Sequence, residues 1–140
     1  MKRYIVIFFY IIFCPKLALA SNYDWESLGR LKCDFDYGTF YDGTNVRTNK
    51  KPLGGDIIII DAINLTTKSV RMTGKIGRNG VKILDDRELL VLGEKTVSGS
   101  WIFTSISPRV GKWFDIAVSQ HSLVSGKPLF SQSYGNCSKY

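Results

Sequence analysis

The only histidine of the chain, His121, lies between two serines, Ser119 and Ser122. In a strand, His121 and Ser119 face the same side, so their side chains can come into contact as a Ser–His pair of the kind that activates a nucleophile. Such a pair depends on geometry supplied by a fold, and no Gly-x-Ser-x-Gly turn accompanies it. We therefore expect no hydrolase chemistry, and we expect His121 to end a strand and cap a loop.

The other candidates for site chemistry are carboxylates. Asp34 and Asp36 alternate on one face of a predicted strand, where a solvated surface is a better interpretation than a cation site. Asp61 follows an isoleucine run, and we expect it to be a buried or edge carboxylate with a hydrogen-bond partner. With one histidine and two widely separated cysteines, Cys33 and Cys137, the chain lacks the ligands of a zinc site. The sequence thus predicts no catalytic residue, no metal and no cofactor.

Aromatic residues are the remaining clue to a site. The chain has three Trp, eight Phe and seven Tyr. In a small barrel such side chains either fill the core or line a cavity for one apolar ligand. If the barrel is hollow, we expect Trp101 or Trp113 at its mouth or inside, and we take Trp101, Trp113 and His121 as the candidate ligand-binding residues.

The first twenty residues have the three parts of a secretory signal peptide. Lys2 and Arg3 precede an uncharged run over 4–14, and small residues flank Leu19 before the predicted cleavage site. A run of eleven residues is too short for a transmembrane anchor, which needs about 20 residues. We expect a single domain over 21–140 in the periplasm of a bacterium or secreted from it, with no membrane anchor after processing.

Removal of this peptide leaves two cysteines, Cys33 and Cys137. An even cysteine count in an exported chain indicates a disulfide, and two cysteines permit only one pairing. The bond would place the first and last strands side by side. Its stabilising effect in the chain-entropy picture is about 4–5 kcal/mol.

Alternation of apolar and polar residues predicts about eight strands and no helix. Turn residues separate them, among them Asp42-Gly43, Asn79-Gly80, Ser98-Gly99-Ser100 and Gly126-Lys127-Pro128. One polar connection over 39–55 is long enough to suggest a functional or mobile loop. The expected fold is an all-β up-and-down, lipocalin-like barrel, with a β-sandwich as the alternative. The expected strands cover 31–37, 56–63, 69–76, 81–85, 88–96, 101–107, 113–120 and 128–134.

The C-terminal third resembles small uncharacterised exported bacterial β proteins. The shared features are a Ser-Gly turn, a Thr-containing strand, a segment with histidine and a tail of the form S-Q-x-Y-G-x-C, here residues 131–137. Those proteins carry a second histidine and an arginine around the histidine segment, whereas this chain has only Ser119-Gln120-His121. The resemblance implies a periplasmic β protein and brings no activity with it.

Charge narrows the choice of partners. The formal net charge is +7, and removing the three cations of the signal peptide, which has no acidic residue, lowers it to +4. The remaining cations are scattered, so a nucleic-acid partner is not expected. Two hypotheses remain: a binding barrel for a small apolar or amphipathic ligand, and a module that binds an envelope protein, such as an inhibitor of a lytic enzyme or an assembly factor. Periplasmic barrels that inhibit lysozyme carry S-G-x-x-Y, and residues 98–102 depart from it at the tyrosine.

Overall fold

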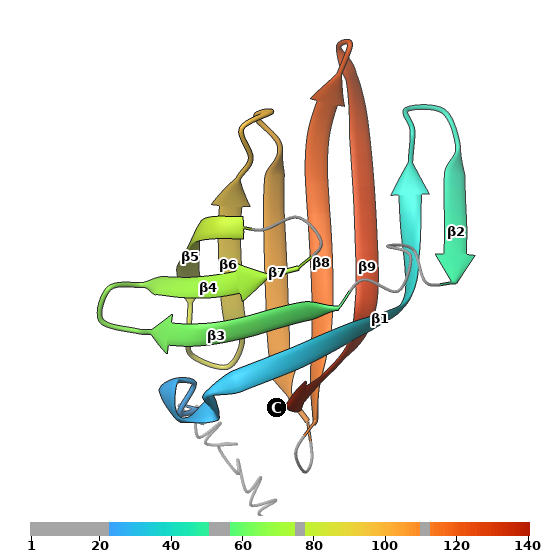
Figure 1. Cartoon of the computed structure of the whole chain (residues 1–140). Helices are drawn as coiled ribbons and strands as arrows, with labels where there is room; N and C mark the ends of the chain where they lie inside the picture. The colour runs from blue at the N-terminus through green and yellow to red at the C-terminus, as the bar shows by residue number, and fades with distance from the viewer. Residues whose placement is uncertain (1–22, 51–56, 75–77, 110–112) are drawn as a thin grey trace, which may run out of the picture.

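In the part of the chain that the structure describes, nine antiparallel strands form one sheet, which closes on itself where β1 (Arg30–Tyr41) pairs with β9 (Lys127–Lys139) (Figure 1). The computed structural model describes residues 23–50, 57–74, 78–109 and 113–140. Eight of these strands make the wall, and β2 (Val46–Lys50) is an additional strand paired with the second half of β1. The predicted barrel is confirmed and the sandwich alternative is wrong. In chain order the elements are η1 (Glu26–Leu28), β1 (Arg30–Tyr41), β2 (Val46–Lys50), β3 (Ile58–Asn64), β4 (Ser69–Thr73), β5 (Arg78–Asp85), β6 (Leu90–Lys95), β7 (Trp101–Pro108), β8 (Trp113–Val124) and β9 (Lys127–Lys139).

The expected long connection over 39–55 is wrong, because this segment contains the end of β1 and the whole of β2. The two strands form a hairpin whose turn includes Gly43 at φ +89°. Val46 and its neighbours in β2 are exposed. A strand that covers no core carries no apolar alternation, so its sequence looks like a loop.

Two expected turns also shift. Asn79 and Gly80 lie inside β5, and residues 75–77 before that strand are outside the described part of the chain. The last hairpin turns at Ser125 and Gly126, with φ of +52° and +75°, so Lys127 already belongs to β9. The β8–β9 hairpin therefore extends well beyond the neighbouring strands (Figure 1). The signal peptide predicted for 1–20 lies outside the described residues.

Apolar side chains fill the inside of the barrel. Strands β4 and β7, the first half of β8 and residues 81–85 of β5 alternate buried and less buried positions in the way one-sided burial requires. In β3 and β6 this alternation is interrupted by two consecutive buried residues. Full burial of each large aliphatic side chain stabilises the fold by about 1.5–3 kcal/mol. The largest aliphatic members of this core with no more than 2 % exposure are Leu31, Ile60, Leu90, Leu92, Ile106, Ile116 and Val81.

The seam between β1 and β9 is closed by the predicted disulfide. Cys33 and Cys137 are directly opposite one another, both buried, with Cα atoms 3.9 Å apart. Directly facing positions in adjacent strands bring two cysteines within bonding reach. Two residues before Cys137 in β9, Gly135 pairs with Phe35, and the register of β1 then shifts by one residue at Asp36.

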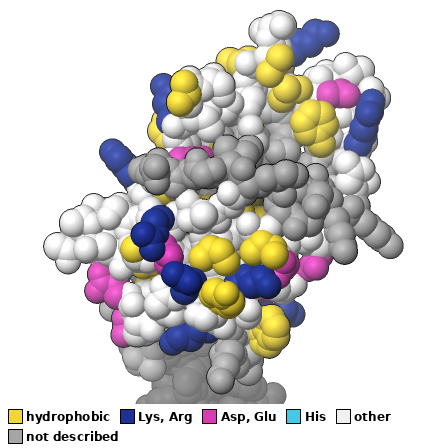
Figure 2. Space-filling view, in the orientation of Figure 1, with side chains coloured by type: hydrophobic (Ala, Val, Ile, Leu, Met, Phe, Trp, Pro, Cys, Tyr) yellow, Lys and Arg dark blue, Asp and Glu magenta, His cyan; other side chains and the backbone are white. Residues whose placement is uncertain are grey.

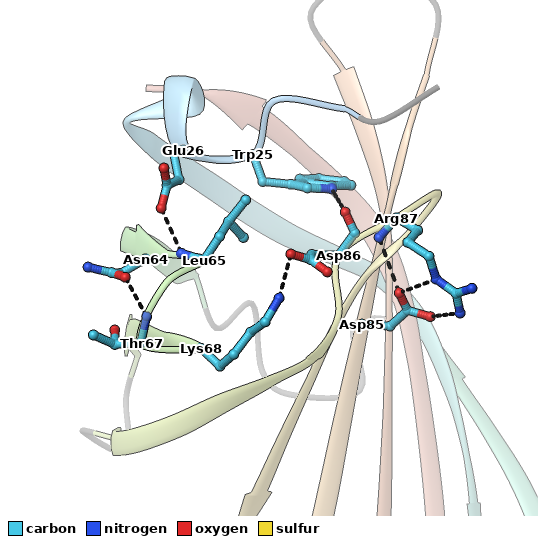
Figure 3. Close-up of polar contacts among 9 residues, drawn as sticks. All are labelled: Trp25, Glu26, Asn64, Leu65, Thr67, Lys68, Asp85, Asp86 and Arg87. Carbon is cyan, nitrogen blue, oxygen red and sulfur yellow. Dashed lines mark hydrogen bonds and ion pairs between the residues drawn. The ribbon is translucent and has the colours of Figure 1, made fainter. Parts of the chain in front are cut away.

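A tryptophan near the start of the described chain fills the end of the barrel beside η1. Trp25 is 0 % exposed and packs against Phe114, with ring centroids 6.3 Å apart. Its indole N–H donates a 3.0 Å hydrogen bond to the backbone carbonyl of Asp86 in the β5–β6 turn (Figure 3). The carboxylate of Glu26 accepts a 2.7 Å hydrogen bond from the backbone N–H of Leu65 in the turn between β3 and β4 (Figure 3). The segment before β1 is thus held to two turns of the barrel.

Asp61 in β3 is a structural carboxylate, as predicted. It is 7 % exposed and accepts hydrogen bonds of 2.6 and 3.0 Å from the Arg71 guanidinium on β4. Arg30 on β1 lies on its other side, with Nε 3.4 Å from a carboxylate oxygen. The hydrogen bond from Arg71 is the main cause that holds the pKa of Asp61 below its usual value, against the effect of burial.

This ion pair predicts a contribution to the acid sensitivity of the fold. Because the pKa of Asp61 is lowered on folding, its stabilising effect is present above the unfolded pKa of about 3.9 and is lost as pH falls through the folded value. Between pH 5 and pH 2, Asp61→Asn should therefore lose less free energy of unfolding than the wild type. Urea unfolding across this range measures the difference. The prediction would be contradicted if the free energy of unfolding of the two proteins fell by the same amount between pH 5 and pH 2.

Candidate interaction surface on the outer wall

One row of side chains crosses four adjacent strands on the outside of the barrel. The strand register places Trp101 opposite His121, His121 opposite Phe130, and Phe130 opposite Tyr41. Phe103 follows Trp101 on the same face of β7, since Ile102 between them is buried. We call these five residues the aromatic wall.

The rings of the aromatic wall touch in an unbroken series. Trp101 and Phe103 stack at 5.9 Å between centroids, and Phe103 meets His121 edge-on at 6.1 Å. His121 in turn meets Phe130 edge-on at 5.2 Å, and Phe130 stacks with Tyr41 at 6.1 Å. Trp101 is nevertheless 45 % exposed and Phe130 40 % exposed. A connected group of large rings is thus partly open to solvent on a rigid sheet.

The structure brings two of the three predicted ligand-binding residues together. Trp101 and His121 are cross-strand neighbours, whereas Trp113 begins β8 at the far end of that strand and is 56 % exposed. Both tryptophans stand on the outer face, because the neighbouring Ile102 and Phe114 are buried. For a hollow barrel we expected Trp101 or Trp113 at the mouth or inside, and neither side chain points inside.

The expectation that His121 ends a strand is also wrong. It lies inside β8, which continues to Val124, and it contacts aromatic rings on both sides. Ser122 bonds instead to Ser100, at 2.8 Å between their hydroxyl oxygens. His121 is therefore a member of the aromatic wall, where it contacts the rings of Phe103 and Phe130.

A second aromatic pair lies on the same outer face, nearer the disulfide. Tyr37 of β1 and Tyr134 of β9 are directly opposite and stack at 5.1 Å between ring centroids. The Tyr134 hydroxyl donates a 2.8 Å hydrogen bond to the side-chain carbonyl of Gln132, which lies between the tyrosine pair and the aromatic wall. The tyrosine pair borders a surface pocket of about 330 Å³, whose lining also includes Asp36 and Asp115.

Sequence reasoning missed Phe103, Phe130 and Tyr41 as members of this surface. The sequence of β7 did carry a sign of this surface. Three consecutive apolar residues, Trp101, Ile102 and Phe103, place apolar side chains on both faces of the strand, whereas a strand buried on one side needs them on one face only. The cross-strand register that assembles residues from β1, β8 and β9 into one row is set by the closed sheet and cannot be read from any single segment.

We also searched the described residues for a metal site, a basic surface for nucleic acid and a membrane-spanning helix. No group of three or more His, Cys, Asp or Glu side chains within that part of the chain is arranged to hold a metal ion. Where the view of Figure 2 shows described side chains, Lys and Arg are interspersed with acidic and hydrophobic ones and form no continuous basic stripe. No helix within the described ranges is both long enough and apolar enough to cross a membrane.

Comparison with known proteins gives no relative. The sequence matches no protein-family model and no curated protein, and the fold matches no solved structure. The functional argument therefore rests on the geometry of this chain alone.

Proposed function

We propose that this protein is a non-enzymatic binding module that acts outside the cytoplasm and docks onto an envelope or secreted protein through its aromatic wall. The observation that carries the proposal is the unbroken series of partly exposed rings from Trp101 to Tyr41. The extracytoplasmic location rests on the expected signal peptide and on the disulfide between Cys33 and Cys137, a bond typical of oxidising compartments.

The composition of the wall resembles the centre of a protein–protein interface. Aromatic residues are enriched there and Lys, Glu and Asp are depleted. Around the rings, the outward positions Ser119, Gln132 and Thr39 are small or uncharged, whereas Lys95, directly opposite Trp101 on β6, is charged. Trp and Tyr are also the residues that most often dominate binding energy when a partner covers them.

The packing inside the barrel weighs against the alternative of a small apolar ligand bound there. The inward side chains of the core are in contact with each other and almost fully buried. The aromatic residues that the ligand hypothesis needs, Trp101 and Trp113, stand outside. A protein partner on the outer face uses the exposed rings without requiring a cavity.

Two substitutions test the proposal. Trp101→Ser with Phe130→Ser removes two exposed rings while leaving the inner face of each strand unchanged. Used as bait in an envelope extract of the producing cell, the double variant should retain at least about thirtyfold less of the partner than the wild type does, because loss of a hot-spot residue costs about 2 kcal/mol or more and each 1.4 kcal/mol is about tenfold. Quantitative mass spectrometry of the retained proteins measures this.

Leu84→Ser is the matched control. Leu84 is 54 % exposed on β5, in the opposite half of the barrel, so its loss also removes exposed apolar surface. The control should retain the partner at the wild-type level. Equal retention by the double variant and the control would overturn the proposed role of the aromatic wall.

A further inference from the structure

The β8–β9 hairpin projects from the end of the barrel that lies next to the aromatic wall. The pairing of β8 with β7 ends at His121, and the pairing of β9 with β1 ends at Phe130. Beyond these two residues, 122–124 and 127–129 pair only with each other in the described part of the chain. The tip of the hairpin therefore stands above the neighbouring turns (Figure 1).

This tip is apolar on both of its faces. Leu123 lies on the outer face above His121, and Val124 lies on the opposite face, because side chains alternate along a strand. The two side chains are 75 % and 53 % exposed. Val97 in the adjacent β6–β7 turn is fully exposed as well. Docking onto the surface of a protein needs apolar side chains on one face, whereas a tip that is apolar all round is suited to insertion into an apolar medium.

The charge at the tip is positive. The segment 119–130 contains Lys127 and no Asp or Glu. Asp42 in the neighbouring β1–β2 turn is paired within its own hairpin, with a carboxylate oxygen 3.7 Å from the Arg47 guanidinium. Figure 2 shows hydrophobic side chains gathered near this upper end of the molecule, with Lys or Arg beside them. Apolar side chains next to a cation complement the acyl chains and the headgroups of an anionic lipid surface.

The barrel holds the hairpin from two sides. The hydroxyl oxygens of Ser122 and Ser100 are 2.8 Å apart, which ties β8 to the β6–β7 turn. On the other side, a Cβ placed on Gly43 would lie 3.7 Å from the Cβ of Lys127. The hairpin closes through a two-residue turn at 125–126 and leaves few backbone groups unpaired at the tip. This economy matters in lipid, where each unpaired backbone group is costly.

We propose that the tip of the β8–β9 hairpin inserts into the interfacial layer of an anionic phospholipid bilayer. Leu123 and Val124 enter the acyl region, and Lys127 contacts the headgroups. The wall residues Trp101 and Phe130, one row below the tip, then lie at the headgroup level, where aromatic side chains are enriched. The inference goes beyond the proposed function and does not depend on it.

Vesicle flotation with the mature protein, residues 21–140, tests the insertion without the apolar run over 4–14. The probe is a vesicle of phosphatidylethanolamine with about 30 % phosphatidylglycerol. Leu123→Ser with Val124→Ser should bind these vesicles at least about tenfold more weakly than the wild type, because two aliphatic side chains lose their burial. Leu84→Ser with Leu89→Ser removes two exposed aliphatic side chains near the opposite end of the barrel and should bind like the wild type.

The contribution of charge is tested separately. Lys127→Gln should weaken binding to the anionic vesicles about fivefold, the effect of one cation near an anionic surface. Lys82→Gln, which removes an exposed cation on β5, should bind like the wild type. Vesicles of phosphatidylcholine alone should bind the wild type more weakly than the anionic vesicles do.

Absence of wild-type binding to the anionic vesicles, or equal binding by the two double variants, would overturn the proposal. Equally strong binding to phosphatidylcholine vesicles would overturn the preference for anionic lipid. The assay contains no protein partner and leaves Trp101 and Phe130 intact. Failure of vesicle binding together with partner loss in the Trp101→Ser, Phe130→Ser variant would therefore reject the membrane contact and leave the aromatic wall standing.

Discussion

Replacing Gly135 with alanine is expected to open the barrel at its seam. A Cβ on Gly135 would overlap the backbone carbonyl oxygen of Asp34 and lie 2.7 Å from the Cα of Phe35. Both contacts are with backbone of the paired strand, so no side-chain rotation relieves them. Separation of β1 from β9 there would expose the core next to the disulfide, and we expect a loss of about 4 kcal/mol or more in the free energy of unfolding. Urea unfolding measures it.

Gly74→Ala is the control for this prediction. A Cβ at Gly74 would meet its nearest neighbours, a backbone oxygen of Ile57 and a side-chain carbon of Ile58, at 3.6 Å, which is ordinary contact. Its loss of stability should stay within about 1 kcal/mol, the cost of a tolerated substitution. If Gly135→Ala were as mild as Gly74→Ala, the seam geometry described above would be incorrect.

Trp25→Ala should have the next largest effect. The side chain is fully buried at the η1 end of the barrel, touches Tyr23 and Phe114, and satisfies the carbonyl of Asp86. Its removal leaves a cavity and an unpaired carbonyl, and Trp→Ala changes in cores cost about 3–5 kcal/mol. Thermal unfolding should show a lower melting temperature. Limited proteolysis should cleave the segment before β1 earlier than in the wild type.

Trp113→Ala is the matched control, since that ring is 56 % exposed on the outer face. The change should cost no more than about 1 kcal/mol, as expected for a surface position. Similar losses at Trp25 and Trp113 would mean that Trp25 does not close the end of the barrel.

The eight wall strands could be predicted from the sequence because each has one wet face and one buried face. The alternation of Val70 and Met72 with Arg71, for example, follows directly from that burial. The disulfide was predictable for a different reason: if the expected signal peptide is removed, Cys33 and Cys137 are the only two cysteines left and permit one pairing. Asp61 was recognised as paired because it follows an apolar run, although the identity of Arg71 as its partner required the strand register.

The candidate site was less predictable. The aromatic wall depends on contacts between strands far apart in the chain, such as His121 with Phe130 and Phe130 with Tyr41. A single sequence does not state this register, so the outward row that Trp101 shares with these rings could not be predicted. The strand β2 was missed because its exposed residues need no apolar alternation.

Site-specific photo-cross-linking tests the central claim, that the aromatic wall is the binding surface, most directly. Benzoylphenylalanine is introduced in the producing cell in place of Phe103 on the wall or, separately, in place of Leu84 on β5. The account predicts that irradiation yields one discrete protein adduct from position 103 and none of that mass from position 84. The absence of an adduct at 103, or the same adduct from both positions, would contradict it.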